Sequence, residues 1–300
     1  MEINLYEQFF AMFEPNKRLY WLYLVSSLII AGVYLYINKK QRRINLSSKL
    51  WLHPSSLLDY KYFIISFFVK TILIIPFIFG ATEVSMFVYE YLLDSYGFIK
   101  ITSFSYGTII ILYTLSLFLV SDFTRYWLHR FLHTIPFLWE FHKVHHSPKV
   151  LNPLSFYRVH PVENILFASR YAFSIGSVTG VFFYFFGAYI SVVEVLGANV
   201  FLFVFSLLGS NLRHSHIKLS YPKMIENFLI SPYQHQIHHS KKHTNKNYGG
   251  YLAIWDKLFG SLEYSKNISK VKFGLGNKEF DTVSKLLFQP FINIGKKYEK

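Results

Sequence analysis

The segment WEFHKVHHSP, residues 139–148, carries three histidines within five positions, and SPYQHQIHHS, residues 231–240, repeats the same HxxHH spacing. Histidine forms helices only moderately well and seldom fills a hydrophobic core, so packing alone does not select such clusters. On a helix, positions i, i+3 and i+4 share one face, so each of these two HxxHH boxes can direct several imidazoles to one side. Metal binding is the chemistry that such a pattern favours.

Two further histidine pairs accompany the boxes. HRFLH begins at His129 and has the i, i+4 spacing of a helix face, whereas RHSH ends at His216 with a spacing that suits a loop or a helix end. One tetrahedral ion needs four ligands, so ten imidazoles predict two ions with four or five ligands each. Imidazole binds iron, zinc, copper and nickel, so the ligands alone leave the metal open. The candidate ligands are His129, His133, His142, His145, His146, His214, His216, His235, His238 and His239.

The composition is that of a membrane protein. Of the 300 residues, 52% are hydrophobic and 20% aromatic, which is more than an ordinary soluble enzyme of this size contains. The chain has no cysteine, which excludes disulfides, thiolate zinc sites and cysteine-held iron–sulfur clusters. The formal net charge is +14, but the basic residues flank apolar segments and form no solvated stripe, so nucleic acid is not an expected partner.

Five apolar segments are long enough to be considered as membrane spans, which need roughly 20 residues each. The last two lie close together and are either two spans or a hairpin that enters the membrane and returns. We therefore expect an all-α fold, a polytopic membrane helical bundle of four to five spans, with a histidine-rich metal-binding cap. The predicted spans are Leu19–Ile37, Tyr62–Gly80, Ile101–Val120, Ile165–Ile190 and Val192–Leu208.

Loop charges predict the orientation of this bundle. The loop after the first span holds six basic residues, whereas the loop after the second holds Glu83, Glu90 and Asp94. The positive-inside rule places the first loop in the cytoplasm and the second outside. All four histidine clusters then fall on the cytoplasmic face. The expected organisation is membrane spans over 1–121, a catalytic region over 122–264 and a basic, partly ordered surface tail over 265–300.

The order HRFLH, WEFHKVHHS, RHSH, SPYQHQIHHS and NYGGYLAIWDKLFGSL resembles the fatty acid hydroxylase / sterol desaturase superfamily of membrane di-iron oxygenases, from about Asp122 to Leu262. The resemblance implies two iron ions held by the histidines of HRFLH and of both HxxHH boxes. The spacing of the RHSH cluster varies in the family, so either His214 or His216 could lie outside the ligand set. The implied reaction is O2-dependent hydroxylation, or desaturation, of a sterol, fatty acyl chain, sphingoid base or alkylglycerol ether. Zinc can replace the iron in recombinant protein.

Six other polar residues are candidates for supporting roles. Asp122, Glu140 and Glu163 either accept hydrogen bonds from ligand imidazoles or form ordinary ion pairs at helix ends. Asn152 and Arg158 follow the first box and are expected to shape the pocket or to bind a polar lipid head group. His160 is assigned either to structure or to substrate contact. His53 and His243 are expected to be ordinary surface residues.

The electrons for such a reaction must come from another protein. The chain has no GxGxxG fingerprint and no cysteine, and its two His-Pro dipeptides lack the Gly-Gly that follows in a fused cytochrome b5 domain. A ferredoxin or a cytochrome b5-like donor is therefore expected. The alternative function is transport or storage of zinc, but transporters usually place their ligands near the membrane midplane, and these histidines follow the spans.

Overall fold

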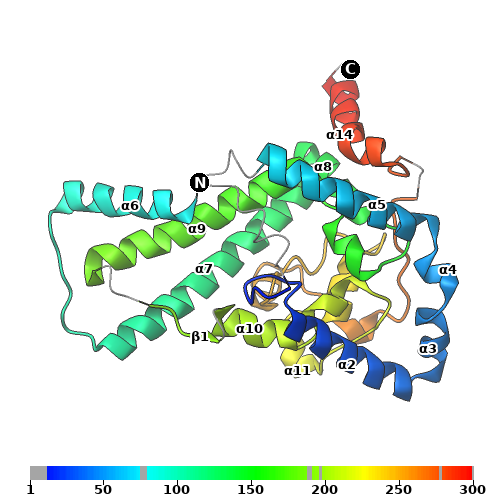
Figure 1. The fold of residues 1–300 in the computed structure, drawn as a ribbon, viewed down its shortest axis with the longest axis horizontal. Helices are drawn as coiled ribbons and strands as arrows, with labels where there is room; N and C mark the ends of the chain where they lie inside the picture. The colour runs from blue at the N-terminus through cyan, green and yellow to red at the C-terminus, as the bar shows by residue number, and fades with distance from the viewer. Residues whose placement is uncertain (1–11, 75–79, 188–190, 196–197, 277–278, 299–300) are drawn as a thin grey trace.

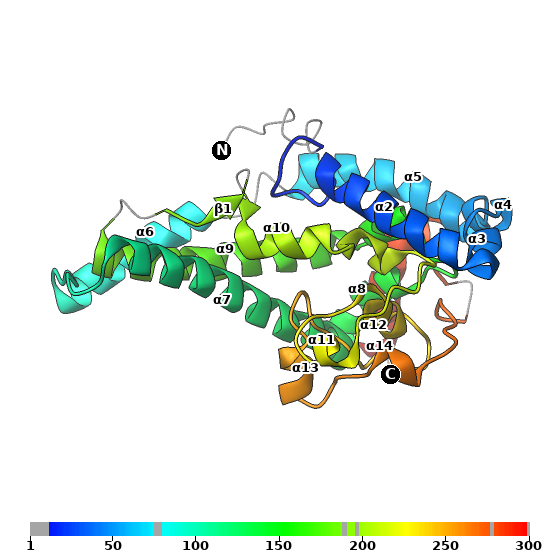
Figure 2. The same ribbon diagram turned by 90° about the horizontal axis from the view of Figure 1, so that it is seen from below.

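The computed structural model describes residues 12–74, 80–187, 191–195, 198–276 and 279–298. Three helices, α6 (Ala81–Tyr96), α7 (Tyr106–Thr134) and α9 (Pro161–Phe186), form an arm that extends from one end of the molecule (Figure 1). Most of the remaining elements gather at the other end into a cap. Helices α2 and α5 cover one side of the cap, and α11 and α13 lie on the opposite side (Figure 2).

The regular secondary structure of the described residues is helical, apart from one short antiparallel strand pair and an isolated bridge between Leu229 and Leu252. The other elements are α2 (Trp21–Ile37), α3 (Lys39–Asn45), α4 (Ser48–Trp51), α5 (Pro54–Val69), η1 (Lys70–Ile74), α8 (Pro136–His146), η3 (Pro153–Tyr157), β1 (Glu194–Val195), β2 (Ala198–Asn199), α10 (Val200–Leu207), η4 (Ser210–His214), α11 (Lys223–Glu226), α12 (Pro232–His238), α13 (Ile254–Leu258), η5 (Ser265–Asn267) and α14 (Val283–Tyr298).

Small residues hold the arm together. Helices α7 and α9, with 29 and 26 residues, are long and apolar enough to cross a membrane. Helix α9 contains GSVTG, and a Cβ atom at Gly176 would lie 2.6 Å from the carbonyl oxygen of Ala81. A Cβ at Gly180 would lie equally close, 2.6 Å, to the carbonyl oxygen of Ser85. Glycines four residues apart thus allow the backbones of α6 and α9 to touch, as in many membrane helix pairs.

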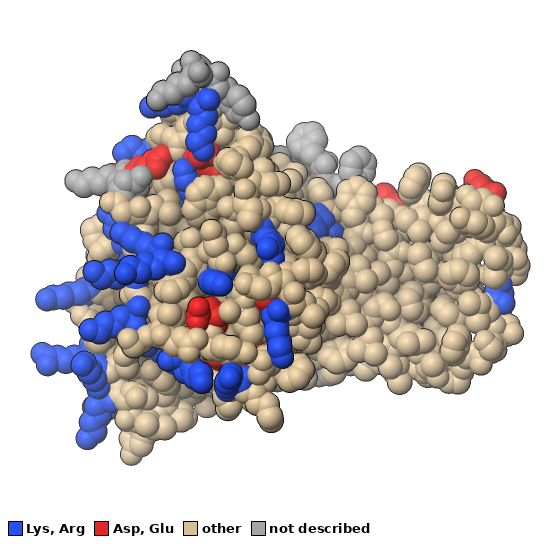
Figure 3. Space-filling view, turned by 180° about the vertical axis from the view of Figure 1, so that it is seen from behind, with Lys and Arg blue, Asp and Glu red and all other residues tan. Residues whose placement is uncertain are grey.

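The surface of the arm is apolar. In Figure 3, Lys and Arg gather over the cap, whereas the visible face of the arm is uncharged except near its far end. Large apolar side chains on the arm are freely exposed, among them Phe87 at 68%, Phe173 at 59% and Ile111 at 56%. Such an extended apolar surface is typical of contact with lipid.

The predicted spans agree only partly with these helices. The segment 81–96, expected in an outer loop, is helix α6. The last predicted span, Val192–Leu208, is not one helix: its described residues form the β1–β2 pair and α10, which has 8 residues and is too short to cross a bilayer. Asn199 caps the start of α10, and Gly209, with φ +86°, follows its end. The segments 75–79 and 188–190, which end the second and fourth predicted spans, lie outside the described residues.

The C-terminal segment is helical, although a partly ordered surface tail was expected. Helix α14 packs on α5 and α8, and its Leu286 is fully buried in a core cluster with Leu58, Tyr62, Val144 and Phe280. The basic composition of this segment did not indicate that residues 283–298 form an amphipathic helix with one apolar face. The cap is thus completed by residues far from either HxxHH box in sequence.

The two His-Pro dipeptides have a common structural role. His53 precedes α5 and His160 precedes α9, and in each case Nδ1 accepts a hydrogen bond, 3.1 Å long, from the backbone N–H two residues later. The proline occupies the first helical turn, where its missing N–H is not needed. His160 also donates from Nε2 to the carbonyl oxygen of Leu287 at 3.0 Å, which ties α9 to α14. The structural alternative for His160 is therefore the one that the contacts support.

Candidate metal centre

Four segments bring the histidines together. The last turns of α7 carry HRFLH, α8 carries the first HxxHH box, η4 ends at the first histidine of RHSH, and α12 carries most of the second box. Ser231 and Gln234 form a capping box that fixes the start of α12, because the Ser231 hydroxyl accepts from the Gln234 N–H and the Gln234 side chain accepts from the Ser231 N–H. Each box thus lies on a short helix, and the helix of the second box is capped at its start.

Nine histidines form two separate groups with buried donor nitrogens. Each HxxHH box contributes to both groups, because the first and last histidines of the first box join one group and its middle histidine joins the other. Within each group, the donor atoms lie within 4.8 Å of one another. The first group is His129, His133, His142, His146 and His238; the second group is His145, His214, His235 and His239.

The second group has the spacing of a single tetrahedral ion. The Nε2 atom of His214 lies 3.3 Å from that of His145, 3.1 Å from that of His239 and 3.4 Å from that of His235. The Nε2 atoms of His235 and His239 are 3.2 Å apart. Four nitrogens arranged tetrahedrally at about 2.0–2.1 Å from one ion would lie about 3.3 Å apart. The donor set therefore fits a metal ion.

The first group offers five imidazoles. The Nε2 atoms of His142 and His146 are 3.2 Å apart, and the ring of His238 lies 4.5 Å from that of His129 and 4.7 Å from that of His133, centroid to centroid. Both ring nitrogens of His133 are buried without a hydrogen-bond partner among the described residues. An unpaired buried polar atom is costly, and a metal ion in the centre of the group would supply the missing partner.

The two groups are in contact through one histidine ring of each. The rings of His146, in the first group, and His239, in the second, stack with centroids 4.5 Å apart and an angle of 24° between their planes. These residues are the last histidines of the two HxxHH boxes. The stacking places the groups side by side, as two ions acting on one substrate would require.

Outer hydrogen bonds orient several of these rings. Nδ1 of His129 donates to the carbonyl oxygen of Tyr248 at 2.7 Å, and Nδ1 of His238 donates to that of Lys246, also at 2.7 Å. Nδ1 of His145 lies 3.2 Å from the carbonyl oxygen of Arg158. A proton held at Nδ1 leaves Nε2 with its lone pair free, which is the form that binds a metal.

A carboxylate lies close to one further ring. Oε2 of Glu163 lies 3.0 Å from Nδ1 of His142, and both side chains are almost completely buried. Burial lowers the pKa of His142 to about 3 and that of His145 to about 4, so both imidazoles are neutral at pH 7. Burial, followed by the neighbouring histidines, also places the pKa of His239 well below its ordinary value. Neutral imidazole is the state that ligates metal.

The NYGGYLAIWDKLFGSL segment supplies the Tyr248 carbonyl that orients His129, and Lys246, whose carbonyl orients His238, directly precedes this segment. Asp256 accepts hydrogen bonds from the N–H groups of Tyr248 and Gly249, at 2.8 and 2.7 Å, and from the Ser261 hydroxyl at 2.6 Å. A Cβ at Gly249 would lie 2.5 Å from the carbonyl oxygen of Leu252, so only glycine fits there. Asp256 was not among the predicted site residues; its position in the WD pair of the closing motif was the available signal.

Asp122 holds the same segment from the side of α7. It accepts from the backbone N–H groups of Tyr251 and Leu252, at 2.9 and 3.0 Å, and from the indole N–H of Trp255 at 3.0 Å. The carboxylate was expected either to accept from a ligand imidazole or to form an ion pair at a helix end. Its side chain instead fixes the loop whose carbonyl groups contact the imidazoles, so its effect on the histidines passes through the backbone.

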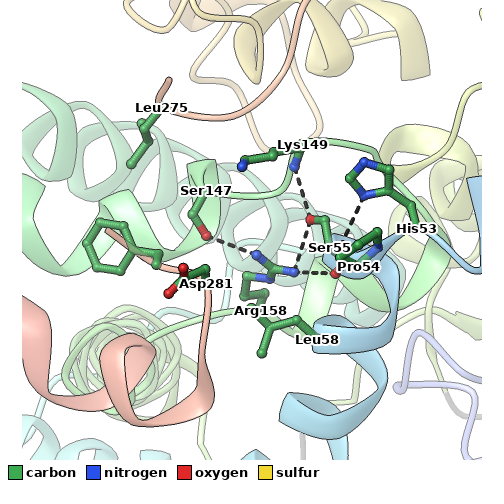
Figure 4. A pocket seen from close by; sticks show the side chains of 10 residues that line it. His53, Pro54, Ser55, Leu58, Ser147, Lys149, Arg158, Leu275 and Asp281 are labelled. Carbon is green, nitrogen blue, oxygen red and sulfur yellow. Dashed lines mark hydrogen bonds between the residues drawn. The ribbon is translucent and has the colours of Figure 1, made fainter. Parts of the chain in front are cut away.

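The side chains of Arg158 and Asn152 belong to a buried hydrogen-bond network around Asp59. Asp59 accepts from Nε of Arg158 at 2.5 Å, from Nδ2 of Asn152 at 2.7 Å and from the Ser155 hydroxyl at 2.6 Å. Arg158 also donates to Ser147 and to the carbonyl oxygen of Ser55 (Figure 4). These contacts hold α5 against the segment after the first box. They leave neither predicted residue free for a lipid head group, and Asp59 was not predicted.

Two further predicted residues lie away from the groups. Glu140 contacts Lys143, Asn293 and Lys297, so it joins α8 to α14 and touches no ligand candidate. His216 belongs to neither group; its ring lies 5.8 Å from that of Phe273, centroid to centroid. Nine of the ten predicted histidines lie in the two groups. His216 does not, because η4 ends at His214 and the backbone of Ser215 is extended.

Two cavities adjoin the groups. One, of about 270 Å³, is lined by histidines of both groups and by residues of α7 and α9. We call it the inner cavity. The other, of about 400 Å³, is lined mostly by apolar side chains of α2 and of the segments 151–157 and 211–217, and we call it the apolar cavity. Arg18 and Tyr157 line both.

Comparison with known proteins identifies relatives among lipid oxidoreductases. Residues 114–261 match the family described as Fatty acid hydroxylase. An ornithine lipid hydroxylase of Rhizobium tropici is 28% identical over 181 residues, which are 59% of this chain and 50% of that protein. Alkylglycerol monooxygenase of Homo sapiens is 30% identical over 165 residues, 53% of this chain and 32% of that protein. Lathosterol oxidase of Rattus norvegicus is 28% identical over 216 residues, 72% of this chain and 65% of that protein.

The chain spans half or less of the length of the first of these relatives, 50% of the bacterial hydroxylase and 32% of the human monooxygenase. No solved structure matches it. The matched residues 114–261 include all nine histidines of the two groups and the closing motif.

Proposed function

We propose that this chain hydroxylates a membrane lipid with O2 at a centre of two iron ions, because residues 114–261 match the family described as Fatty acid hydroxylase. The relatives are named as a lipid hydroxylase, a monooxygenase and a sterol oxidase, so oxidation of a lipid is what their names share. The observation that carries the proposal is the convergence of nine histidines into two groups with the spacing of bound ions.

In this proposal the first and second groups hold one ion each. Bound iron supplies O2 activation and the cleavage of an unactivated C–H bond, which no side chain of the twenty amino acids performs alone. The protein orients the imidazoles of His238 and His129 through the carbonyl groups of Lys246 and Tyr248, and the carboxylate of Glu163 lies 3.0 Å from Nδ1 of His142. The histidines are buried, which excludes bulk water from the reacting carbon.

The lipid is positioned by the two cavities. The apolar cavity offers a surface of leucine, alanine and tryptophan side chains for hydrocarbon, including Leu24, Ala31 and Trp51. The inner cavity brings the reacting carbon to the histidines. Their common residues, Arg18 and Tyr157, place the two volumes next to each other, so one lipid can occupy both.

The proposed orientation puts the cap in the cytoplasm, with α7 and α9 crossing the membrane. The support is the loop charge distribution together with the cationic cap surface in Figure 3. Electrons would then come from a cytoplasmic ferredoxin or cytochrome b5-like protein, whose acidic surface the basic cap attracts. The chain itself has no cysteine for an iron–sulfur cluster.

The test is oxygen transfer to lipid. Iron-loaded protein in vesicles, given a chemical reductant, ¹⁸O2 and a total lipid extract, is expected to place one ¹⁸O atom in a lipid product detected by mass spectrometry. The variant His145→Ala should abolish the product, and His243→Ala, which alters a histidine outside both groups, should retain it. Metal transport into the vesicles without any O2-dependent product would refute the proposal.

A further inference from the structure

The inner cavity is strongly cationic. Its wall carries five basic side chains and one carboxylate, in addition to histidines of both groups. The basic residues come from the segment before α2, from η1, from α7, from α9 and from η4, so the charge is not a property of one helix. The residues are Arg18, Lys70, Arg125, Arg170 and Arg213, and the carboxylate is Glu163.

Among the described residues, no carboxylate forms a direct ion pair with these basic residues, and Glu163 lies against His142. Arg18 donates to the Asn211 side chain and the Ser210 carbonyl oxygen, and Arg213 donates to the carbonyl oxygens of Gly250 and Ile230. These acceptors are neutral. Glu163 acts on Lys70, and Asp122 acts on Arg125 and Arg170, so two carboxylates face five basic side chains and the cavity keeps an excess of positive charge.

Part of their hydrogen-bonding capacity is also unused. Nε of Arg170 and Nε of Arg213 are buried without a partner among the described residues. Arg213 is 6% exposed, and burial lowers its pKa to about 9, so the guanidinium is still charged at pH 7. A buried charged donor without a partner is costly to the fold, which indicates that a ligand completes the site.

The position of the charges is equally informative. Lys70 follows the apolar end of α5, and Arg125 and Arg170 lie on the cap-side parts of α7 and α9, the two helices long enough to cross a membrane. Charged side chains within such segments generally mark a functional site. These three residues stand between the apolar arm and the histidines.

We propose that the inner cavity binds an anionic group of the lipid substrate, a carboxylate or a phosphate ester. This inference rests on the proposed function and specifies its substrate class. Guanidinium groups bind both anions through paired hydrogen bonds, and the ammonium of Lys70 adds a point charge. At about 270 Å³, the inner cavity holds the anionic group and its adjoining carbons but not a whole lipid. The carbon that reacts therefore lies close to the anionic end of the molecule.

Binding of short amphiphiles to the full-length protein tests this inference without relying on activity. The protein, in neutral maltoside detergent, is titrated calorimetrically with octyl phosphate, octanoate, octanol and inorganic phosphate. Octyl phosphate or octanoate is expected to bind at least about tenfold more tightly than octanol and than inorganic phosphate, because a charged hydrogen bond and the alkyl chain both contribute.

Two substitutions locate the site. Lys70→Met and Arg125→Gln should each lower the affinity for the preferred anion by about tenfold or more, since each removes one charge. The affinity for octanol should stay unchanged. Lys61→Met is the matched control, because Lys61 is exposed on α5 and lines none of the cavities described, and it should change neither affinity. The hydrogen bond from Arg125 to the Tyr251 hydroxyl is long, 3.4 Å, and its guanidinium also lies over the rings of Phe167 and Tyr251, at 5.9 and 5.4 Å from their centroids. Its substitution therefore removes no short hydrogen bond between described residues.

Several outcomes would overturn the inference. Octanol that binds as tightly as the anions, or affinities unaffected by Lys70→Met and Arg125→Gln, would show that the charges select no substrate. Inorganic phosphate that binds as tightly as octyl phosphate would assign the site to a free anion. Failure of the proposed function is seen separately: anionic amphiphiles would bind as expected, while the iron-loaded protein would incorporate no ¹⁸O into any lipid.

Discussion

At His129 and His238, a backbone carbonyl decides which ring nitrogen is free. The carbonyl groups of Tyr248 and Lys246 accept the Nδ1 protons. Tyr248 belongs to the segment that Asp256 and Asp122 hold in place, and Lys246 lies two residues before Tyr248. Substitution of a distant carboxylate can therefore change the geometry at the histidines without removing a ligand. The closing motif acts on the metal groups through hydrogen-bonded backbone, although its side chains lie elsewhere.

Metal content distinguishes the histidines of the groups from those outside them. Wild-type protein is expected to hold close to two ions per chain by elemental analysis, irrespective of whether they are iron or zinc. His235→Ala should lower this to about one, because it removes one of the four donors of the second group. His216→Ala is the matched control and should leave two. An unchanged content in His235→Ala would mean that the second group binds no ion.

The sequence indicated which histidines gather at this centre, but it did not indicate how they divide into two groups. The i, i+3, i+4 spacing is a local property of a helix, so it correctly indicated that histidines of each box share one side. It could not show that each box serves two groups, because this depends on how α8 and α12 are packed. It also could not exclude His216, whose displacement depends on the backbone of Ser215.

Helix α14 was not predicted from the sequence. Glu140 on α8 is fully buried, and Lys297 of α14 donates to it at 2.6 Å. Burial raises the pKa of Glu140, but hydrogen bonds from Lys143, Lys297 and Asn293 outweigh it, and the pKa lies below its ordinary value of 4.5. The charged carboxylate therefore stabilises the docked helix above pH 4.5, and this contribution is lost as the pH falls below that value.

Glu140→Gln should loosen α14 without affecting metal content. Hydrogen exchange of residues 283–298 is expected to become about tenfold faster at pH 7, because two ion pairs are lost at a buried acid. Acidification of the wild type below pH 4.5 should have the same effect, and the variant should respond less. Asp281→Asn, which removes the exposed pair with Lys285, should have little effect. Equal exchange in both variants would contradict the anchoring role of Glu140.

The molecule as a whole combines an apolar arm with a basic cap. Hydropathy predicted α7 and α9, since their own composition is sufficient to identify them. It did not predict α6, because Glu83, Glu90 and Asp94 suggested a loop, and the contact that supports the helix lies on α9 at Gly176 and Gly180. Contacts between segments far apart in the chain leave no periodic pattern in either segment.

The cysteine-free chain makes the topology directly measurable. Single cysteines introduced at Lys100, beyond the far end of the arm, and at Lys242, on the cap, should react with membrane-impermeant maleimide from opposite sides of a sealed vesicle. In the proposed orientation, Lys242→Cys is labelled only from the cytoplasmic side. Labelling of both positions from the same side would show that the arm lies along the membrane and does not cross it.

Because each HxxHH box contributes to both groups, the ligands of the two groups are synthesised in a fixed order. When residue 146 has left the ribosome, four donors of the first group exist, but the second group has only His145. The remaining donors of the second group appear only after the α9 helix and the following hairpin have been made. The nascent chain thus cannot complete the second group until translation has passed residue 239. A ribosome that stalls earlier releases a polypeptide that can hold at most one of the two ions.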